Sequence, residues 1–419
     1  MPILRVMDKV ARPMQRLGYL KHLVQKIASN PTNNMVNVGH DLVDIVLKKV
    51  KVQLNENRAN YVKIRLFDKA YKKLKEQTDL WLNNVDEPSH VLMEIQDAYL
   101  SDSQLPSQVG KLVKDDWRKY PQFGINLGLI REGTNSITTR GLTILHFTSS
   151  AERNAFLEYD AEVNPFLLAL NQKLVYLYSL IENDGEVFLP LLKKISQKIE
   201  SEFSDRDAGD LIPDIYSAII SRYKTRSLSY DLRQRLDSLD QSSVNIVEAG
   251  KSERYLGGSS REIASRPRIE PYADIGLFIK PNSLRYVYSI SPIGLSWAKA
   301  TEDIDDSIAI EYFLNNCFFH TVTDAWRLKA ELIDNVEDIV DRLKQAAKII
   351  SSSSGYSPIE ELALLAGIDA LVEDHQFFEI GTAREAIIAY QKTNPYQIRF
   401  TVDRMGTLAY AKFVEDSTR

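Results

Sequence analysis

Apolar residues recur every three or four positions over most of this 419-residue chain. This spacing puts them on one face of a helix, so it predicts amphipathic helices rather than strands. Leu42, Ile45 and Val46 followed by Val50 are one example. We expect residues 1–100 to form a helical region, in which the helical pattern covers 1–28, 37–50, 60–83 and 87–100.

The helical pattern is interrupted near residue 127. Two short helical segments in 103–126 are followed by LGLI, the polar tip REGTN and SITT, and then by the helical pattern RGLTILHF. Gly133 and Asn135 are residues that favour tight turns, and Gly141 would let the closing helix pack closely. We therefore predict the order helix, helix, strand, hairpin tip, strand, helix.

The same order recurs in 269–300. IGLF (275–278) matches LGLI, and SISPIGLSWAK (289–299) matches SITTRGLTILH. A polar tip at 281–285 separates the two strands, and Gly294 stands where Gly141 stands in the first copy. Self-similarity of this kind indicates a repeated structural unit.

The two copies resemble the winged helix-turn-helix superfamily, in which a strand, a wing and a second strand follow the third helix. The resemblance implies a mainly α multi-domain fold with small β-hairpins, with tandem winged-helix units at 101–160 and 263–300. Between the two units we expect a helical bundle at 161–225 and a Ser-rich flexible linker at 226–262.

The C-terminal third has a long helical pattern over 301–350, and then a helix-hairpin domain over 356–419. In its turn DRMG, Arg404 is at the tip and Gly406 can take a positive φ. This domain is a candidate third, degenerate winged helix, although the Leu-Gly-Leu-Ile step is missing from its usual place.

In winged helices the helix before the first strand enters the major groove and the wing approaches phosphate or the minor groove. The resemblance therefore implies DNA contacts from residues of the reading helix and wings. In the second copy, Pro267 and Pro271 should shorten that helix, and Glu270 and Asp274 would repel phosphate, so this copy is also a candidate protein contact. The implied DNA-contacting residues are Arg118, Lys119, Gln122, Asn126, Arg131, Thr134, Asn135, Arg140, Lys280, Asn282, Arg285 and Arg404.

Charge is distributed unevenly. The chain carries −5 overall, but residues 1–80 hold 16 Lys and Arg against 7 Asp and Glu. A basic region on an acidic chain is typical of a nucleic-acid partner. The alternative is a helical face that is simply solvated.

Candidate chemistry for catalysis is sparse. The sequence contains no Gly-rich phosphate loop, no Gly-x-Ser-x-Gly elbow and no His-Glu-x-x-His helix. Asp303, Asp305 and Asp306 could bind Mg²⁺, but such a run more often begins a helix. Asp374 and Glu379 lack the lysine that a nuclease motif needs, because Gly381 takes its place.

The single cysteine and the six scattered histidines provide no disulfide framework and no zinc cluster. Cys317 is expected to be a buried thiol, with a redox or nucleophilic role as the alternative. These features favour a cytoplasmic protein without a cofactor, and no apolar run is long enough to cross a membrane.

The main hypothesis is a protein that binds double-stranded DNA, as a regulator or as the DNA-recognition subunit of a larger prokaryotic complex. Chromosome organisation and foreign-DNA defence are the contexts considered, with a protein partner or a second copy of the chain. The alternatives are a winged-helix scaffold that docks onto an ATPase or another partner without reading DNA, and a metal-dependent nuclease.

Overall fold

The computed structural model describes most of the chain beyond residue 119 and two segments before it. The described residues are 3–7, 17–29, 120–134, 136–153, 167–198, 202–224, 228–251, 260–280, 287–352, 354–402, 406 and 408–414. They form a mainly helical fold with a few small sheets, as the sequence predicts. The basic segment 61–77 lies outside the described residues.

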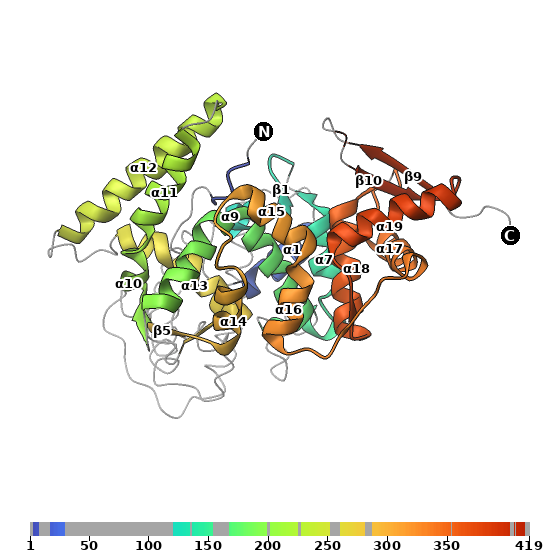
Figure 1. Cartoon of the computed structure of the whole chain (residues 1–419), viewed down its shortest axis with the longest axis horizontal. Helices are drawn as coiled ribbons and strands as arrows, with labels where there is room; N and C mark the ends of the chain where they lie inside the picture. Colours follow the sequence, from blue (N-terminus) through green and yellow to red (C-terminus); the bar gives the residue numbers. More distant parts are fainter. Residues whose placement is uncertain are drawn as a thin grey trace, which may run out of the picture.

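The helices are numbered in chain order (Figure 1). They are α1 (Gly18–Ser29), α6 (Tyr120–Asn126), α7 (Thr139–His146), α9 (Leu170–Lys198), α10 (Asp205–Gly209), α11 (Ile212–Lys224), α12 (Tyr230–Lys251), α13 (Ser260–Ile275), α14 (Pro292–Ala300), α15 (Ser307–Asn316), α16 (Phe318–Trp326), α17 (Val336–Ile350), α18 (Ile359–Glu373) and α19 (Ile380–Thr393).

The strands are short and form four small sheets, which have the orders β1-β2, β3-β5-β4, β7-β10-β9 and β6-β8. All the pairings are antiparallel except that between β6 and β8. The strands are β1 (Ile130–Arg131), β2 (Ser136–Ile137), β3 (Phe203–Ser204), β4 (Phe278–Ile279), β5 (Val287–Ile290), β6 (Glu331–Leu332), β7 (Ser357–Pro358), β8 (Gln376–Phe377), β9 (Ile398–Val402) and β10 (Leu408–Phe413).

Helix α9 is the central element of the fold, and it packs against α7, α11, α13, α14, α15 and α18 (Figure 1). The segment Asn183–Asp184–Gly185 contains residues that favour turns, but α9 continues through it. A Cβ on Gly185 would lie 3.0 Å from Ile310 Cδ1. This glycine therefore permits the close approach of α15 and does not end a helix.

The predicted repeat is present, and its two copies share the same local hydrogen bonds. Thr138 and Ser291 cap α7 and α14 by accepting from the amides of Gly141 and Gly294. Each hydroxyl also donates to the carbonyl of a glycine that has a positive φ, Gly128 or Gly276 in the preceding turn. One capping residue thus joins the turn before the hairpin to the helix after it, and capping of this kind stabilises a helix by about 1 kcal/mol.

The two closing glycines lie against backbone. A Cβ on Gly141 would be 2.5 Å from Leu129 O, and a Cβ on Gly294 would collide with Leu277 O. Helix propensity alone would make Gly294→Ala stabilising by about 1 kcal/mol. The collision of the new Cβ with Leu277 O makes the substitution destabilising instead. We expect a loss of about 1–3 kcal/mol in the free energy of unfolding, measured by urea denaturation.

The control for this prediction is Ser296→Ala, at an exposed position of the same helix α14. It should change the free energy of unfolding by no more than about 0.5 kcal/mol. A Gly294→Ala protein as stable as the wild type would show that the backbone of the hairpin can move away from the helix.

The second copy is larger than the sequence predicts. Strand β3 pairs with β5 and completes a three-stranded sheet, and α10 packs against α13. Between α10 and α13 the chain forms α11 and α12, which pack together and project from the molecule (Figure 1). The segment predicted as a flexible linker is therefore largely helical.

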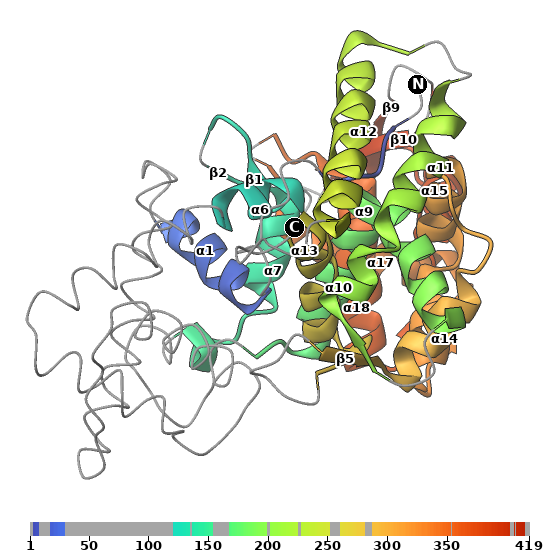
Figure 2. The same ribbon diagram turned by 90° about the vertical axis from the view of Figure 1, so that its left-hand side faces the viewer.

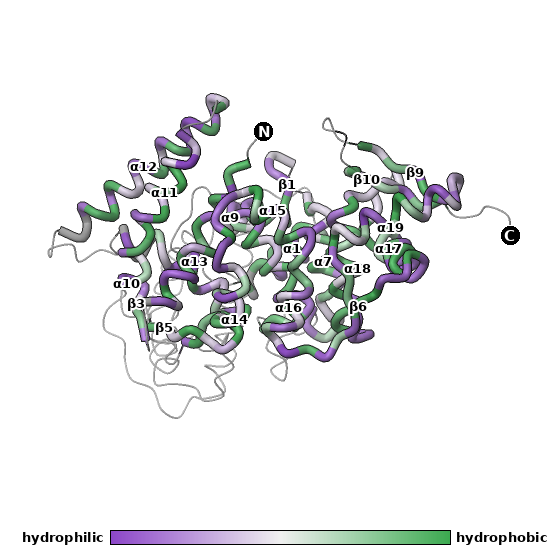
Figure 3. Tube along the Cα trace, in the orientation of Figure 1, coloured by the Kyte–Doolittle hydropathy of each residue, from purple (hydrophilic) through white to green (hydrophobic). Residues whose placement is uncertain are grey.

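Helix α12 forms despite its Ser-rich sequence because one face is apolar. Leu232, Leu236, Leu239 and Ile246 are buried, whereas most of the other positions carry charged or polar residues. Hydrophilic and hydrophobic residues accordingly alternate along this helix in Figure 3. Tertiary packing of an amphipathic face, rather than intrinsic propensity, supplies most helical stability.

Helix α13 also departs from the prediction, because it runs through both Pro267 and Pro271. A proline inside a helix removes a hydrogen bond and costs about 3 kcal/mol. Residues 265–272 are all buried, so packing offsets this cost.

The region 301–350 contains more separate elements than its sequence pattern predicts. It contains α15, α16, β6 and α17 in place of one long helical region. Arg327, which caps α16, has a left-handed conformation with φ 54° and turns the chain. The predicted helix-hairpin domain follows, and Gly406 has a positive φ as expected.

The three hairpins do not share one side of the molecule. Figures 1 and 2 show hairpin β1-β2 and strands β9 and β10 toward the upper side, whereas β5 lies at the lower side. Within the described part of the chain, no helix is long and apolar enough to cross a membrane.

Candidate functional site

Half of the predicted DNA-contacting residues lie outside the described residues. These are Arg118, Lys119, Asn135, Asn282, Arg285 and Arg404. The other six can be placed, and they fall into an outward-facing group and a buried group.

The outward-facing group belongs to the first copy. Arg131 and Thr134 are exposed at the β1-β2 hairpin. Gln122 and Asn126 are half-buried on α6, and the Gln122 side-chain amide donates to the Asn126 side-chain oxygen over 3.0 Å. Arg131 makes no ion pair with any residue that the structure describes, so its charge is available to a partner.

Arg140 belongs to the buried group and is only 4% exposed. Its guanidinium donates to the carboxylates of Glu182 on α9 and Glu361 on α18, the latter over 2.6 Å. Glu360 lies 4.0 Å away. The first turn of α7 faces α9, so this arginine points into the molecule and joins three parts of the fold.

The three glutamates around Arg140 have different pKa values. Burial raises the pKa of Glu361, and burial together with the charge of Glu182 raises the pKa of Glu360 to about 7. Burial also disfavours ionised Glu182, but its ion pair with Arg140 lowers the pKa below the usual value. Glu182 is therefore the principal counter-ion of Arg140, and Glu360 is near its titration point at neutral pH.

Lys280 is also buried and paired, although it lies at the start of the second wing. Its ammonium is 2.8 Å from the Glu270 carboxylate, which also accepts from the hydroxyl of Tyr288. Arg266 pairs with Asp205, and Arg268 pairs with Asp184 at 2.7 Å. Arg266, Arg268 and Lys280 of the second copy are thus paired internally, and Glu270 is the partner of Lys280.

Two exposed cations that the sequence reasoning missed belong to the C-terminal unit. Lys392 lies in the last turn of α19, and Arg399 lies on β9. Neither is ion-paired within the described residues. The sequence contains a signal for them, because residues 380–414 hold five Lys and Arg against two Asp and Glu.

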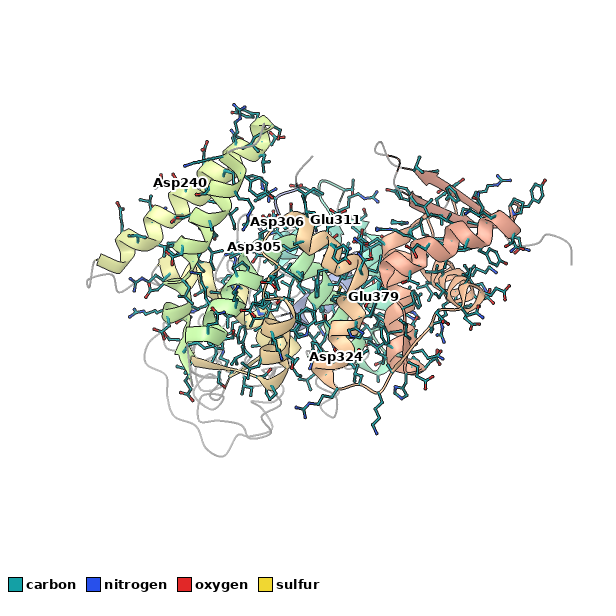
Figure 4. The ribbon with its side chains drawn as sticks, in the orientation of Figure 1. Asp240, Asp305, Asp306, Glu311, Asp324 and Glu379 are labelled. Carbon is teal, nitrogen blue, oxygen red and sulfur yellow. The ribbon has the colours of Figure 1, made fainter. Side chains whose placement is uncertain are left out.

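Acidic residues are concentrated in a different part of the chain. Figure 4 labels Asp240, Asp305, Asp306, Glu311, Asp324 and Glu379, which come from α12, the connection before α15, α15, α16 and the residue before α19. Residues 301–350 alone hold eleven Asp and Glu against five Lys and Arg. Exposed carboxylates repel nucleic acid.

Three of the carboxylates considered for metal binding or nuclease chemistry have other partners. Asp306 caps α15 by accepting from the amides of Ile308 and Ala309. Asp305 pairs with Arg222, and Glu379 accepts from the amides of Phe319 and His320. Among the described residues, no group of three His, Cys, Asp or Glu side chains could hold a metal ion.

Cys317 is a free thiol between α15 and α16, and it is half-buried. Burial and the negative charge of Glu379 raise its pKa. A raised pKa keeps the thiol protonated, whereas a nucleophilic cysteine needs a thiolate.

A polar cavity of about 600 Å³ lies beside the Arg140 network. Its walls come from residues 3–7, the end of α6, and helices α7, α9, α12, α15, α18 and α19. Four arginines and four glutamates line it, namely Arg5, Arg140, Arg235, Arg384, Glu182, Glu311, Glu360 and Glu361. It is therefore a junction of the N-terminal segment, the first copy of the repeat, α9, α12, α15 and the C-terminal unit.

No family model, no curated protein and no solved structure matches this chain. Its function has to be inferred from its own residues, and two features are relevant. These are the exposed cations on hairpins β1-β2 and β9-β10 and on α19, and the charged cavity between them.

Proposed function

We propose that the protein binds double-stranded DNA with the side that carries hairpins β1-β2 and β9-β10. It would act as a regulator or as the DNA-recognition subunit of a larger complex. The observation that carries the proposal is the placement of Arg131, Lys392 and Arg399, which are exposed and unpaired within the described residues. Phosphate contacts from such cations supply most non-specific affinity for DNA.

The arrangement of the small sheets supports a winged-helix interpretation. In two of the sheets, a strand from earlier in the chain pairs with the second strand of a hairpin. Strand β3 pairs with β5 of hairpin β4-β5, and β7 pairs with β10 of hairpin β9-β10. In each case helices lie between the early strand and the hairpin. In the C-terminal unit, α19 directly precedes this hairpin. It therefore stands where a winged helix has its reading helix, with Lys392 and Arg399 beside it.

The distribution of charge supports an oriented complex. Residues 120–419 hold 32 Lys and Arg against 43 Asp and Glu, so most of the folded body repels DNA. Residues 1–80 carry a surplus of nine positive charges that would add to the attraction. In this proposal the second copy, in which Arg266, Arg268 and Lys280 are paired internally, contributes to assembly rather than to DNA contact.

The proposal predicts a salt-dependent affinity for a random-sequence duplex of about three helical turns, measured by fluorescence anisotropy at several NaCl concentrations. Each phosphate contact contributes a slope of about −0.9 in log affinity against log salt. Replacing Arg131, Lys392 and Arg399 together with alanine should reduce the magnitude of the slope by about 2.7 and weaken binding at low salt.

The matched control is Lys299→Ala, which removes an exposed lysine from α14 in the second copy. It should leave the slope unchanged. If the triple variant and the wild type have the same slope, or if the wild type has no affinity at low salt, the proposal is wrong.

The second candidate is a scaffold that docks onto another protein. Exposed apolar side chains gather in the C-terminal unit, where Ile388, Tyr396, Val402 and Tyr410 are all at least 40% exposed. A protein-binding surface is one explanation of such exposure. The same anisotropy titration separates the candidates, because a pure scaffold has no salt-dependent affinity for DNA.

A further inference from the structure

Two hydrogen-bond donors in the wall of the cavity at the junction have no acceptor among the described residues, although four carboxylates also line it. The carboxylates of Glu182 and Glu361 accept from Arg140, and Glu360 accepts from the hydroxyl of Tyr178 over 2.6 Å. In contrast, the Nε–H groups of Arg5 and Arg384 are buried and have no acceptor among the described residues. A buried donor without a partner costs about 1–3 kcal/mol, so an acceptor from outside would be favourable.

Arg5 and Arg384 both contact helix α15 in the wall of the cavity, and Arg384 also lies 3.8 Å from the Glu360 carboxylate. The Arg5 guanidinium is 3.7 Å from Glu311, and that of Arg384 donates to Asn315 over 2.6 Å. Glu311 and Asn315 are one turn apart on α15, where side chains are neighbours about 5–6 Å apart. The two guanidinium groups therefore approach one turn of α15 from different elements, the segment 3–7 and helix α19.

The geometry points to a small phosphorylated ligand, up to the size of a mononucleotide, held in this cavity by Arg5 and Arg384. A phosphate group has three terminal oxygens and close to two negative charges at neutral pH, so it can accept from two separate guanidinium groups. Arginine also matches phosphate geometry with paired N–H donors. A cavity of about 600 Å³ is in the range that holds such molecules.

The ligand would connect parts of the chain that are distant in the sequence. Arg5 belongs to the N-terminal segment, Arg384 to α19, and their neighbours Glu311 and Asn315 to α15. A ligand that binds the folded protein and not the unfolded chain raises stability by mass action. Ligand binding should therefore stabilise the docking of α19 on α15, and this does not depend on whether the protein binds DNA.

The test is isothermal titration calorimetry of the full chain in the absence of DNA. AMP, adenosine and inorganic phosphate are each titrated separately. We expect AMP to bind and adenosine to bind at least about tenfold more weakly, because a charge-assisted hydrogen bond is lost. Arg384→Gln should weaken AMP binding by a similar factor. Equal binding of AMP and adenosine, or no binding of AMP and phosphate, would overturn the inference.

The control is Lys392→Gln, which removes a cation from the same helix outside the cavity lining. It should bind AMP as the wild type does. Thermal denaturation without ligand shows whether Arg384→Gln remains folded. If this variant is unfolded, the comparison of AMP with adenosine on the wild-type protein tests the phosphate site. AMP binding that persists in a folded Arg384→Gln protein places the ligand elsewhere and rejects the proposal.

A phosphate could come from a free nucleotide or from the end of a nucleic-acid strand. Trinucleotides with a 5′-phosphate and with a 5′-hydroxyl distinguish these sources. Tighter binding of the 5′-phosphorylated trinucleotide than of AMP identifies a strand end, and the reverse order identifies a free nucleotide. Both results support a phosphate site, whereas equal affinity for the two trinucleotides contradicts it.

Discussion

Replacing Arg140 with methionine is expected to lower the free energy of unfolding by about 3–5 kcal/mol, because it leaves buried carboxylates without their counter-ion. Arg140 is the shared partner of Glu182 and Glu361, which belong to α9 and α18. Methionine keeps much of the packing volume of the arginine side chain. The loss in the free energy of unfolding therefore comes mainly from the missing positive charge. Urea denaturation followed by circular dichroism measures the effect.

Two further variants make this result specific. Arg131→Met removes an exposed arginine from the same hairpin unit and should change the free energy of unfolding by no more than about 0.5 kcal/mol. Adding Glu182→Gln and Glu361→Gln to Arg140→Met should restore part of the loss, because the uncompensated charges are gone. If Arg140→Met is as stable as Arg131→Met, Arg140 is not held in the ion-pair network.

Asp184→Leu should destabilise the protein by a similar amount, about 3–5 kcal/mol, for a related reason. The Asp184 carboxylate accepts from Arg268 at 2.7 Å and 3.1 Å and from the amide of Met7 at 2.9 Å. Both Asp184 and Arg268 are almost fully buried. The variant leaves a buried guanidinium unpaired and removes an acceptor that holds the N-terminal segment against α9.

Urea denaturation measures the loss in the free energy of unfolding of Asp184→Leu. Amide hydrogen exchange at Met7 measures how far the N-terminal segment itself is destabilised. Exchange at Met7 should accelerate more than exchange at Leu343, which is buried on α17 and lies in the C-terminal unit. The control Asp237→Leu changes an exposed aspartate on α12 and should alter neither quantity appreciably. Unchanged protection of Met7 in Asp184→Leu would mean that the N-terminal segment does not depend on this carboxylate.

Both experiments concern charges that the sequence alone could not assign. Arg131 and Arg140 flank the same short hairpin, and both were expected to contact DNA. Arg131 lies on the strand before the tip and is exposed, whereas Arg140 lies in the first turn of α7 and faces α9. Arg140 is buried because α9 packs against α7. The sequence of the hairpin does not show which helix packs there.

The second copy shows the same limit. Its sequence contains Arg266, Arg268 and Lys280 near the expected reading helix and wing, a pattern typical of a nucleic-acid contact. Asp205 and Asp184, the partners of Arg266 and Arg268, come from other helices, so residue spacing gives no sign of these two pairs. Opposite charges far apart in sequence neutralise each other only once the helices are packed.

Local sequence determined the repeated hairpin, since its turns and caps depend on glycines and hydroxyl residues within a few positions of one another. It also determined the mainly helical character and the positive φ at Gly133 and Gly406. The tertiary structure decided which helices continue, as in α9, α12 and α13, because burial overrides local breaks and weak propensity. It also paired β3 with β5 and placed Arg140 and Arg268 beside buried carboxylates, since partners distant in the chain meet only through packing.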